Sequence, residues 1–236
     1  MMTTATWAAQ TRALAPHFGC LLHDFRGQLR SAKPPGPYAM AMHVGDLLAL
    51  LDAEGIERLH LVGTSYGGEV AMMFAAAHPE RVRSLTVIAC VSRVNDVLAE
   101  GVTRWARTAR EEPERLWDVT APYNYSAAFL AANPGFAEAA RQRMSSLPAD
   151  WYRALADLCD AFVTLDVDLA AIRCPTLVVA AEHDALKPLA FSREIAAGIA
   201  GARLQVIEGA GHAVVIERPD EVSAAVLEFL CSQPSG

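Results

Sequence analysis

The chain alternates between short apolar runs and longer amphipathic stretches. Apolar runs that predict buried strands span residues 20–25, 58–63, 82–90, 174–184 and 202–212. Helical spacing of apolar positions, with glycine or proline at the ends, predicts helices over 5–17, 42–55, 67–79, 188–199 and 219–230. Strands that are apolar throughout and separated by helices are typical of a parallel sheet covered on both faces. The pattern therefore predicts an α/β fold.

The middle of the chain departs from this alternation. Residues 93–168 contain no convincing strand, yet they carry three of the four tryptophans and three of the five tyrosines. We expect a helical cap insertion over 93–168 in an α/β core formed by residues 1–92 and 169–236. The core is short at its N-terminal side.

Composition narrows the class of protein. A chain of 236 residues with 53% hydrophobic residues can bury a substantial core. The net charge is −7, and no block of lysine or arginine could follow a phosphate backbone. We therefore expect no nucleic-acid partner.

The cysteines and the first residues of the chain indicate its cellular compartment. The five cysteines are scattered, odd in number and without metal-ligand spacing, which predicts a reduced cytoplasmic protein without metal or other cofactor. The first residues lack the basic and apolar segments of a signal peptide, and no apolar run reaches the length of a membrane span. We expect a soluble protein without a membrane partner.

One short motif carries candidate chemistry. Gly63, Ser65 and Gly67 form G-x-S-x-G where a predicted strand ends and a helix begins. A serine in such a tight turn projects its hydroxyl from the edge of the sheet, and flanking glycines are expected because side chains there would collide. The following helix start suits a developing oxyanion. The alternative is a serine that only caps the helix.

A nucleophilic serine needs a base and an acid. Among the seven histidines, His212 follows a strand in a loop of small residues, whereas His60 and His78 have structural explanations. Asp184 directly follows another strand, and its neighbours Glu182 and His183 are weaker candidates for the acid. Ser65, Asp184 and His212 stand in the order serine, acid, histidine at the ends of three predicted strands.

These motifs resemble those of the α/β-hydrolase superfamily. DFRGQLRS is similar to the family's D-x-R-G-x-G-x-S loop, GTSYGG to its nucleophile elbow, PTLVVAAEHD to its acid strand, and GAGHAVVIERPDEV to its histidine loop. From Phe25 onward the resemblance covers nearly all of the chain except the helical insertion, which corresponds to the family's variable cap. It implies Ser65 as nucleophile, His212 as base, Asp184 as acid, and the backbone N–H of Tyr66 as one oxyanion donor.

Two features depart from the family. Leu29 stands where the loop usually has glycine. The family begins with about three strands and an H-G loop that supplies the second oxyanion donor, and neither is found here. A missing strand between 20–25 and 58–63 should leave a gap in the sheet. Three explanations are open. Met1 is an internal methionine of a longer natural protein, the remaining strands rearrange or pair between the subunits of a homodimer, or the chain is an inactive remnant. We favour the first two.

The predicted function is that of a serine hydrolase for a small carboxylic ester or lactone. The insertion and the stretch LPADWYRALADLCDAF most resemble lactonase and esterase members such as 3-oxoadipate enol-lactonases. Tyr123 and Trp151 are candidates for the substrate pocket, with packing inside the insertion as the alternative. A C–C bond hydrolase or haloperoxidase-like enzyme would use the same triad. A non-catalytic ligand-binding protein is the alternative from another class.

Overall fold

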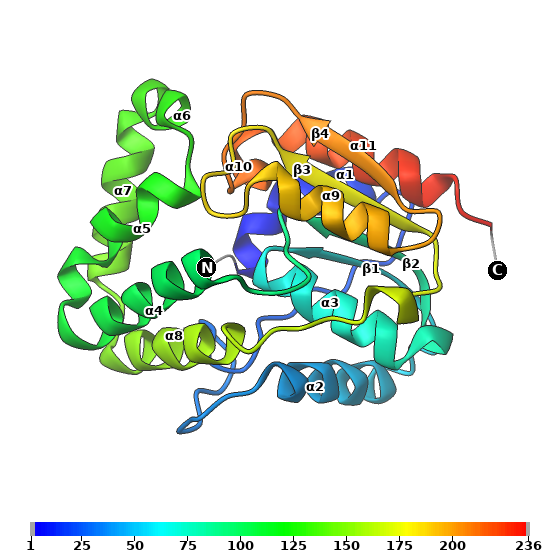
Figure 1. The fold of residues 1–236 in the computed structure, drawn as a ribbon, viewed down its shortest axis with the longest axis horizontal. Coiled ribbons are helices and arrows are strands. Elements are labelled where there is room, and N and C mark those ends of the chain that lie inside the picture. The colour runs from blue at the N-terminus through cyan, green and yellow to red at the C-terminus, as the bar shows by residue number, and fades with distance from the viewer. Residues whose placement is uncertain (1–2, 235–236) are drawn as a thin grey trace.

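A parallel four-stranded sheet forms the centre of the molecule (Figure 1). The computed structural model describes residues 3–234. The strands lie in the order β1-β2-β3-β4, with bounds β1 Leu59–Thr64, β2 Val82–Ile88, β3 Thr176–Ala181 and β4 Arg203–Ile207. All three neighbouring pairs are parallel. Four of the five predicted strands and the α/β class are confirmed.

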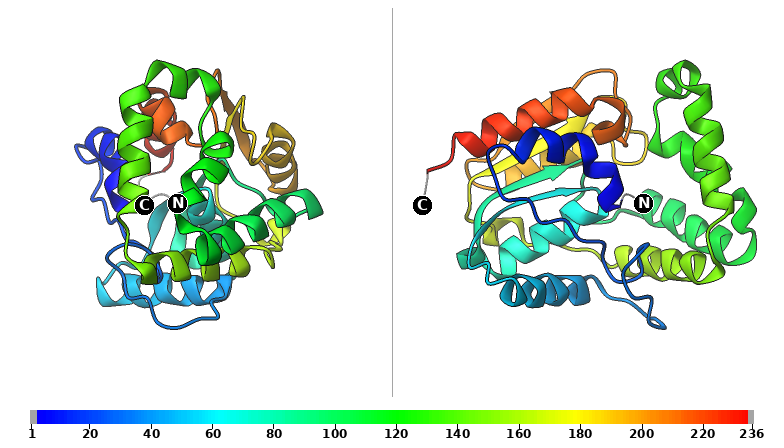
Figure 2. Two further views of the ribbon diagram at one scale, coloured as in Figure 1. Left: turned by 90° about the vertical axis from the view of Figure 1, so that its left-hand side faces the viewer. Right: turned by 180° about the vertical axis from the view of Figure 1, so that it is seen from behind.

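Helices cover both faces of this sheet. Helices α3 and α9 pack on one face, with α2 against α3, whereas α11 packs on the other face with α1 against it (Figure 2). The short helix α10 precedes α11. The bounds are α1 Ala8–Leu14, α2 Met40–Ala53, α3 Tyr66–Ala77, α9 Leu189–Gly198, α10 Val214–Glu217 and α11 Pro219–Cys231, with 3₁₀ turns Thr4–Trp7, Pro79–Arg81, Pro113–Arg115 and Leu169–Ala171.

The central strand β3 shows why its sequence is apolar throughout. Every residue of Thr176–Ala181 is buried. Val178 joins the core that contains α3 and α9, whereas Leu177 and Val179 join the core that contains α11. Side chains of a strand alternate between the two faces, so a strand covered on both sides needs apolar residues at consecutive positions.

Residues 93–168 form a group of helices at one end of the molecule (Figure 1). Helices α4 and α8 pack along each other, and the group follows the carboxyl end of β2. Within this range the structure has only an isolated bridge between Arg93 and Asp166 and no strand. The bounds are α4 Asp96–Glu111, α5 Leu116–Asn124, α6 Ala127–Ala132, α7 Pro134–Ser145 and α8 Ala149–Phe162.

The prediction of a strand over residues 20–25 is wrong. This segment is irregular and does not pair with the sheet, so β1 is an edge strand in the described part of the chain. The first four residues of β1 are only half-buried, and Leu21 and Leu22 are exposed. An apolar run becomes a strand only where a neighbouring strand accepts its hydrogen bonds, and no described strand lies between this segment and β1.

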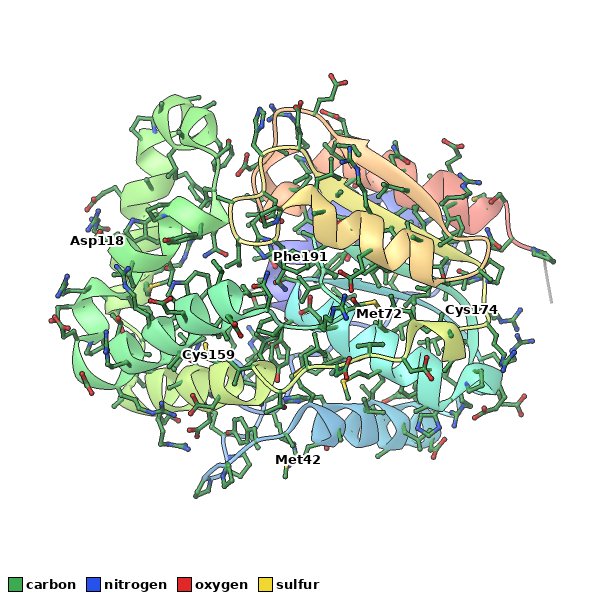
Figure 3. All side chains as sticks on the ribbon, in the orientation of Figure 1. Met42, Met72, Asp118, Cys159, Cys174 and Phe191 are labelled. Atoms are coloured by element: carbon green, nitrogen blue, oxygen red, sulfur yellow. The ribbon has the colours of Figure 1, made fainter. Side chains whose placement is uncertain are left out.

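The side chains drawn in Figure 3 include both buried and exposed residues. Met72 on α3 is fully buried, whereas Met42 on α2 and Asp118 on α5 are exposed. All five cysteines are free, among them the buried Cys159 and the partly buried Cys174. Among residues 3–234, no helix has the length and apolar character needed to cross a membrane.

Candidate active site

Ser65 occupies a strained turn between β1 and α3. Its φ is 50° and its ψ is −128°, a region that residues with side chains rarely adopt. The turn is held because Ser65 N donates to Ile88 O at 2.8 Å, while Gly68 N and Glu69 N both donate to Ser65 O. The side chain of Ser65 makes no cap hydrogen bond to the helix, which argues against the capping role. Its hydroxyl is left for other contacts.

The glycines around Ser65 have different roles. A Cβ at Gly63 would lie 2.5 Å from Gly67 O, and one at Gly68 would lie 2.2 Å from Cys90 Sγ. Neither approach is sterically allowed. A Cβ at Gly67 would meet only Phe25, at an ordinary contact distance of 3.7 Å. The collision predicted at Gly63 is therefore confirmed, whereas the one predicted at Gly67 is not. The second glycine that a side chain could not replace is Gly68.

The structure brings Ser65, His212 and Asp184 into one hydrogen-bonded chain. Ser65 Oγ lies 2.9 Å from His212 Nε2, and His212 Nδ1 lies 2.8 Å from Asp184 Oδ2. His212 and Asp184 are 3% and 5% exposed. The other oxygen of Asp184 accepts the backbone N–H groups of Leu186 at 2.9 Å and Lys187 at 2.7 Å. Because the bonds to Asp184 from His212 and from Lys187 N are buried, the Asp184 carboxylate and the imidazole have fixed orientations.

Glu217 fixes the loop that carries His212. Its buried carboxylate accepts Gly211 N at 3.0 Å, Ser126 N at 2.7 Å and Ser126 Oγ at 2.6 Å. A neighbouring bond runs from Ala213 N to Asn124 O at 2.7 Å. The helical insertion therefore touches the histidine loop directly.

Lys187 and Glu69 form a buried ion pair beside Ser65. Lys187 Nζ lies 2.7 Å from Glu69 Oε1, and the two side chains are 3% and 0% exposed. The same Nζ donates to Ser65 Oγ at 3.2 Å. Sequence reasoning missed both residues. The available signals were a glutamate inside the small-residue helix GGEVAMM and a lysine three positions after the candidate acid.

A cavity of about 990 Å³ reaches Ser65 and His212. Trp151, a candidate for the substrate pocket, lines it together with Trp105, Trp117 and Phe162 from the insertion. Tyr123, the other candidate, is not among the lining residues: it is 43% exposed and packs edge-on against Trp105. The cavity also follows the free edge of β1 and residues 18–23, where the sheet ends.

Comparison with known proteins fits this geometry. A family model described as the alpha/beta hydrolase fold matches residues 2–219. The chain belongs to the α/β-hydrolase fold family. It is 32% identical over 231 residues to a protein provisionally named carbamate hydrolase RutD from Caulobacter sp. (strain K31), covering 96% of this chain and 86% of that protein.

Solved structures of other α/β hydrolases are also similar. The enzyme MGS-M2 from a Medee basin deep-sea metagenome library superposes with a TM-score of 0.95 at 27% identity, covering 100% of this chain and 88% of that one. The enol-lactonase from Burkholderia xenovorans LB400 superposes with a TM-score of 0.89 at 31% identity, covering 98% and 87% of the two chains. These relatives support a hydrolase of small substrates.

Tyr66 follows the serine of this α/β hydrolase. It is the first residue of α3, so its backbone N–H has no preceding helical carbonyl to bond. Its ring is buried against Phe25, His43 and Phe162, and burial raises the pKa of its phenol far above the usual range. The phenol therefore stays protonated.

The remaining candidate side chains lie away from Ser65 and have other contacts or are exposed. His60 Nδ1 lies 2.8 Å from Ser84 Oγ on the neighbouring strand, and His78 ends α3 against the ring of Phe74. His183 is 61% exposed, and Glu182 accepts the N–H of Gly209. None of the four contacts Ser65. Among the described residues, no three His, Cys, Asp or Glu side chains are grouped to hold a metal ion.

Proposed function

We propose that this α/β hydrolase is a serine hydrolase that cleaves a small carboxylic ester or lactone through an acyl-enzyme. The observation that carries the proposal is the hydrogen-bonded chain from Ser65 Oγ through His212 to Asp184, at a strained turn that borders a large cavity. Each group has the partner that its role requires: nucleophile to base, and base to orienting acid.

In the first step, Ser65 Oγ attacks the carbonyl carbon while its proton moves to His212 Nε2. Asp184 accepts the Nδ1–H and stabilises the imidazolium that forms. The tetrahedral intermediate collapses, the bond from carbon to the leaving oxygen breaks, and that oxygen takes the proton from His212. Tyr66 N–H donates to the oxyanion.

In the second step, water attacks the acyl-enzyme. Its proton goes to His212 Nε2 as its oxygen bonds to the carbonyl carbon. The bond between that carbon and Ser65 Oγ then breaks, and Oγ recovers the proton from His212. The product is the free carboxylic acid, and the enzyme returns to its starting state.

The choice of substrate class rests on the cavity and the relatives. Aromatic side chains of the insertion, including Trp151 and Phe162, give the cavity an apolar wall suited to a small organic acyl group. The named relatives include an enol-lactonase and a provisional carbamate hydrolase, so carbamates belong in the substrate panel. A C–C bond hydrolase and a haloperoxidase-like enzyme remain the alternatives within the same triad.

A fluorophosphonate probe and p-nitrophenyl acetate test the proposal. The wild type should be labelled at Ser65 and should turn over the ester, and Ser65→Ala should lose both. A panel of acyl esters, lactones and carbamates then orders the substrate classes. Labelling without turnover of any panel member would favour the ligand-binding alternative. Absence of labelling at Ser65 in the folded wild type would overturn the serine hydrolase.

A further inference from the structure

We propose that Lys187 is a further catalytic residue, whose ammonium stabilises negative charge on Ser65 Oγ as that oxygen attacks and leaves. The proposal rests on the serine hydrolase proposed above and adds a group to its machinery. It assigns a function to a buried cation that the serine, histidine and acid do not require.

The geometry places the ammonium on the nucleophilic atom itself. Lys187 Nζ donates to Ser65 Oγ at 3.2 Å, while His212 Nε2 lies 2.9 Å from the same oxygen. Oγ can donate its proton to His212 and accept from Lys187 at the same time, because a hydroxyl has one donor and two acceptor positions. Charge that develops on Oγ then meets a donor already in place.

Burial makes this contact strong and holds it in position. The Lys187 side chain is 3% exposed, and its Nζ lies 4.8 Å from the centroid of the Phe162 ring. Hydrogen bonds from a charged donor are stronger than neutral ones, and the low dielectric of the interior increases this difference. The backbone N–H of Lys187 donates to Asp184 Oδ1 at 2.7 Å, which fixes the start of the side chain as well.

Glu69 compensates the charge of Lys187. A buried ammonium without a partner would destabilise the fold, and Glu69 Oε1 supplies that partner at 2.7 Å. The same oxygen accepts Val91 N at 3.0 Å, which holds the carboxylate on the far side of the ion pair. Glu69 Oε2 has no hydrogen-bond partner among the described residues. Because Glu69 carries this compensation, Lys187 is free to turn a second N–H to Ser65.

The chemical role concerns both steps of the reaction. As the proton leaves Oγ for His212, partial negative charge appears on Oγ before its bond to the carbonyl carbon is complete. The same charge returns when that bond breaks in deacylation. Lys187 only strengthens its hydrogen bond to Oγ, so no additional proton transfer is involved.

The test removes the charge without leaving its partner unpaired. In the double variant Lys187→Met/Glu69→Gln both charges are absent and the volume is nearly kept. We expect this variant to fold, to be labelled at Ser65 by the fluorophosphonate probe about 10- to 100-fold more slowly, and to keep the KM for p-nitrophenyl acetate. Lys187→Arg, which keeps a cation, should recover part of the rate. Lys33→Met, at the other lysine of the chain, is the control and should react at the wild-type rate.

A second measurement needs no variant at Lys187 or Glu69 to fold. The chain has only two lysines, Lys33 and Lys187, so a protein labelled with ¹⁵N at the lysine side chains gives two signals that Lys33→Arg assigns. Phosphonylation of Ser65 should shift the Lys187 signal and leave the Lys33 signal unchanged, since only Lys187 contacts Oγ.

The outcomes separate the two proposals. If the wild type is labelled at Ser65 but the folded double variant is labelled within about threefold of its rate, Lys187 has no catalytic role and the serine hydrolase stands. An unmoved Lys187 signal after labelling would likewise remove Lys187 from the catalytic machinery. If the wild type is not labelled at all, both proposals fail.

Discussion

The two sides of Ser65 are built differently. On one side, the loops after β3 and β4 bring Asp184, Lys187 and His212 together, and none of the three is more than 5% exposed. On the other side, residues 20–25 are irregular, Leu21 and Leu22 are exposed, and β1 has no described neighbour at its outer edge. The first side is buried and hydrogen-bonded and meets the cavity at Lys187 and His212, whereas the second side follows the cavity along β1 and residues 18–23.

This difference separates two requirements of a hydrolase. Proton transfer needs groups held within about half an ångström of their productive positions, and buried loops on a parallel sheet supply that precision. Substrate binding needs space, and the cavity along β1 and beneath the insertion is the space that the proposed function requires. We therefore expect substitutions on the packed side to cost far more than substitutions on the open side.

The largest effect is expected for Asp184→Asn. The amide keeps the size of the side chain, but it no longer provides the carboxylate that holds the imidazole in its working tautomer and stabilises the imidazolium. We expect kcat to fall by about 10⁴-fold with KM nearly unchanged. Steady-state kinetics with p-nitrophenyl acetate measures this, and a loss below about tenfold would mean that Asp184 is not the acid.

The next effect compares two glycines of the same turn. Gly63→Ala places a Cβ 2.5 Å from the backbone oxygen of Gly67, and it should lower the free energy of unfolding by about 3 kcal/mol. A Cβ in Gly67→Ala meets only Phe25, at 3.7 Å, and should change the free energy of unfolding by less than about 1 kcal/mol. Urea denaturation of the pair measures the difference. Equal losses would contradict the difference in free space at the two glycines.

The third effect depends on pH and comes from His43. This fully buried side chain has no hydrogen-bond partner on either ring nitrogen among the described residues, and burial lowers its pKa to about 4. Asp46 opposes this shift, whereas Arg26 and His23 add to it. Between pH 6.5 and pH 4 the unfolded chain takes up a proton that folded His43 does not, so stability falls as pH falls.

Over that window the His43 contribution amounts to about 3 kcal/mol, since one pKa unit corresponds to about 1.4 kcal/mol. His43→Leu should flatten the pH dependence of the unfolding free energy by this amount, and His17→Leu, at an exposed histidine, should not. Asp46 adds a loss of its own on acidification, because its hydrogen bond from Arg26 lowers the pKa of that carboxyl. The difference between wild type and His43→Leu isolates His43; an unchanged slope would refute this origin.

The smallest effect is expected at the ion pair between Arg26 and Asp46. Arg26 Nε and Nη2 contact the two oxygens of Asp46 at 2.6 and 2.5 Å, but both side chains are about one-third exposed. Arg26→Ala should therefore lower the free energy of unfolding by only about 0.5–1 kcal/mol, and less in high salt. A loss above about 2 kcal/mol would show that the open side is more tightly held than its exposure indicates.

The features that could be predicted from the sequence are those with a local pattern. The apolar runs of β1 to β4 and the helical insertion are visible because each element carries its own periodicity. Ser65, Asp184 and His212 could be selected because each follows a strand end, and parallel strands bring their carboxyl ends to one edge. The structure places these three residues in hydrogen-bonding contact.

The features that could not be predicted depend on partners distant in the chain. Lys187 and Glu69 are separated by 118 residues, and nothing local in either segment indicates that their charges meet in the interior. Residues 20–25 have the composition of a strand, but pairing needs a neighbour that the sequence pattern cannot place. The collision that requires Gly68 involves Cys90 on another element, so the motif alone favoured the wrong glycine.

The carboxylate of Glu217 also joins the insertion to the histidine loop. It accepts hydrogen bonds from Ser126, 91 residues away, and from Gly211 in one buried cluster. A second attachment of the insertion lies on α8, where the half-exposed Arg153 donates to Lys33 O and Pro34 O in the loop before α2. Buried charge-assisted bonds break less readily than exposed ones, so amide hydrogen exchange should be slower at Ser126 and Gly211 than over residues 33–38. Glu217 therefore ties the insertion to the histidine loop more firmly than Arg153 ties it to residues 33–34.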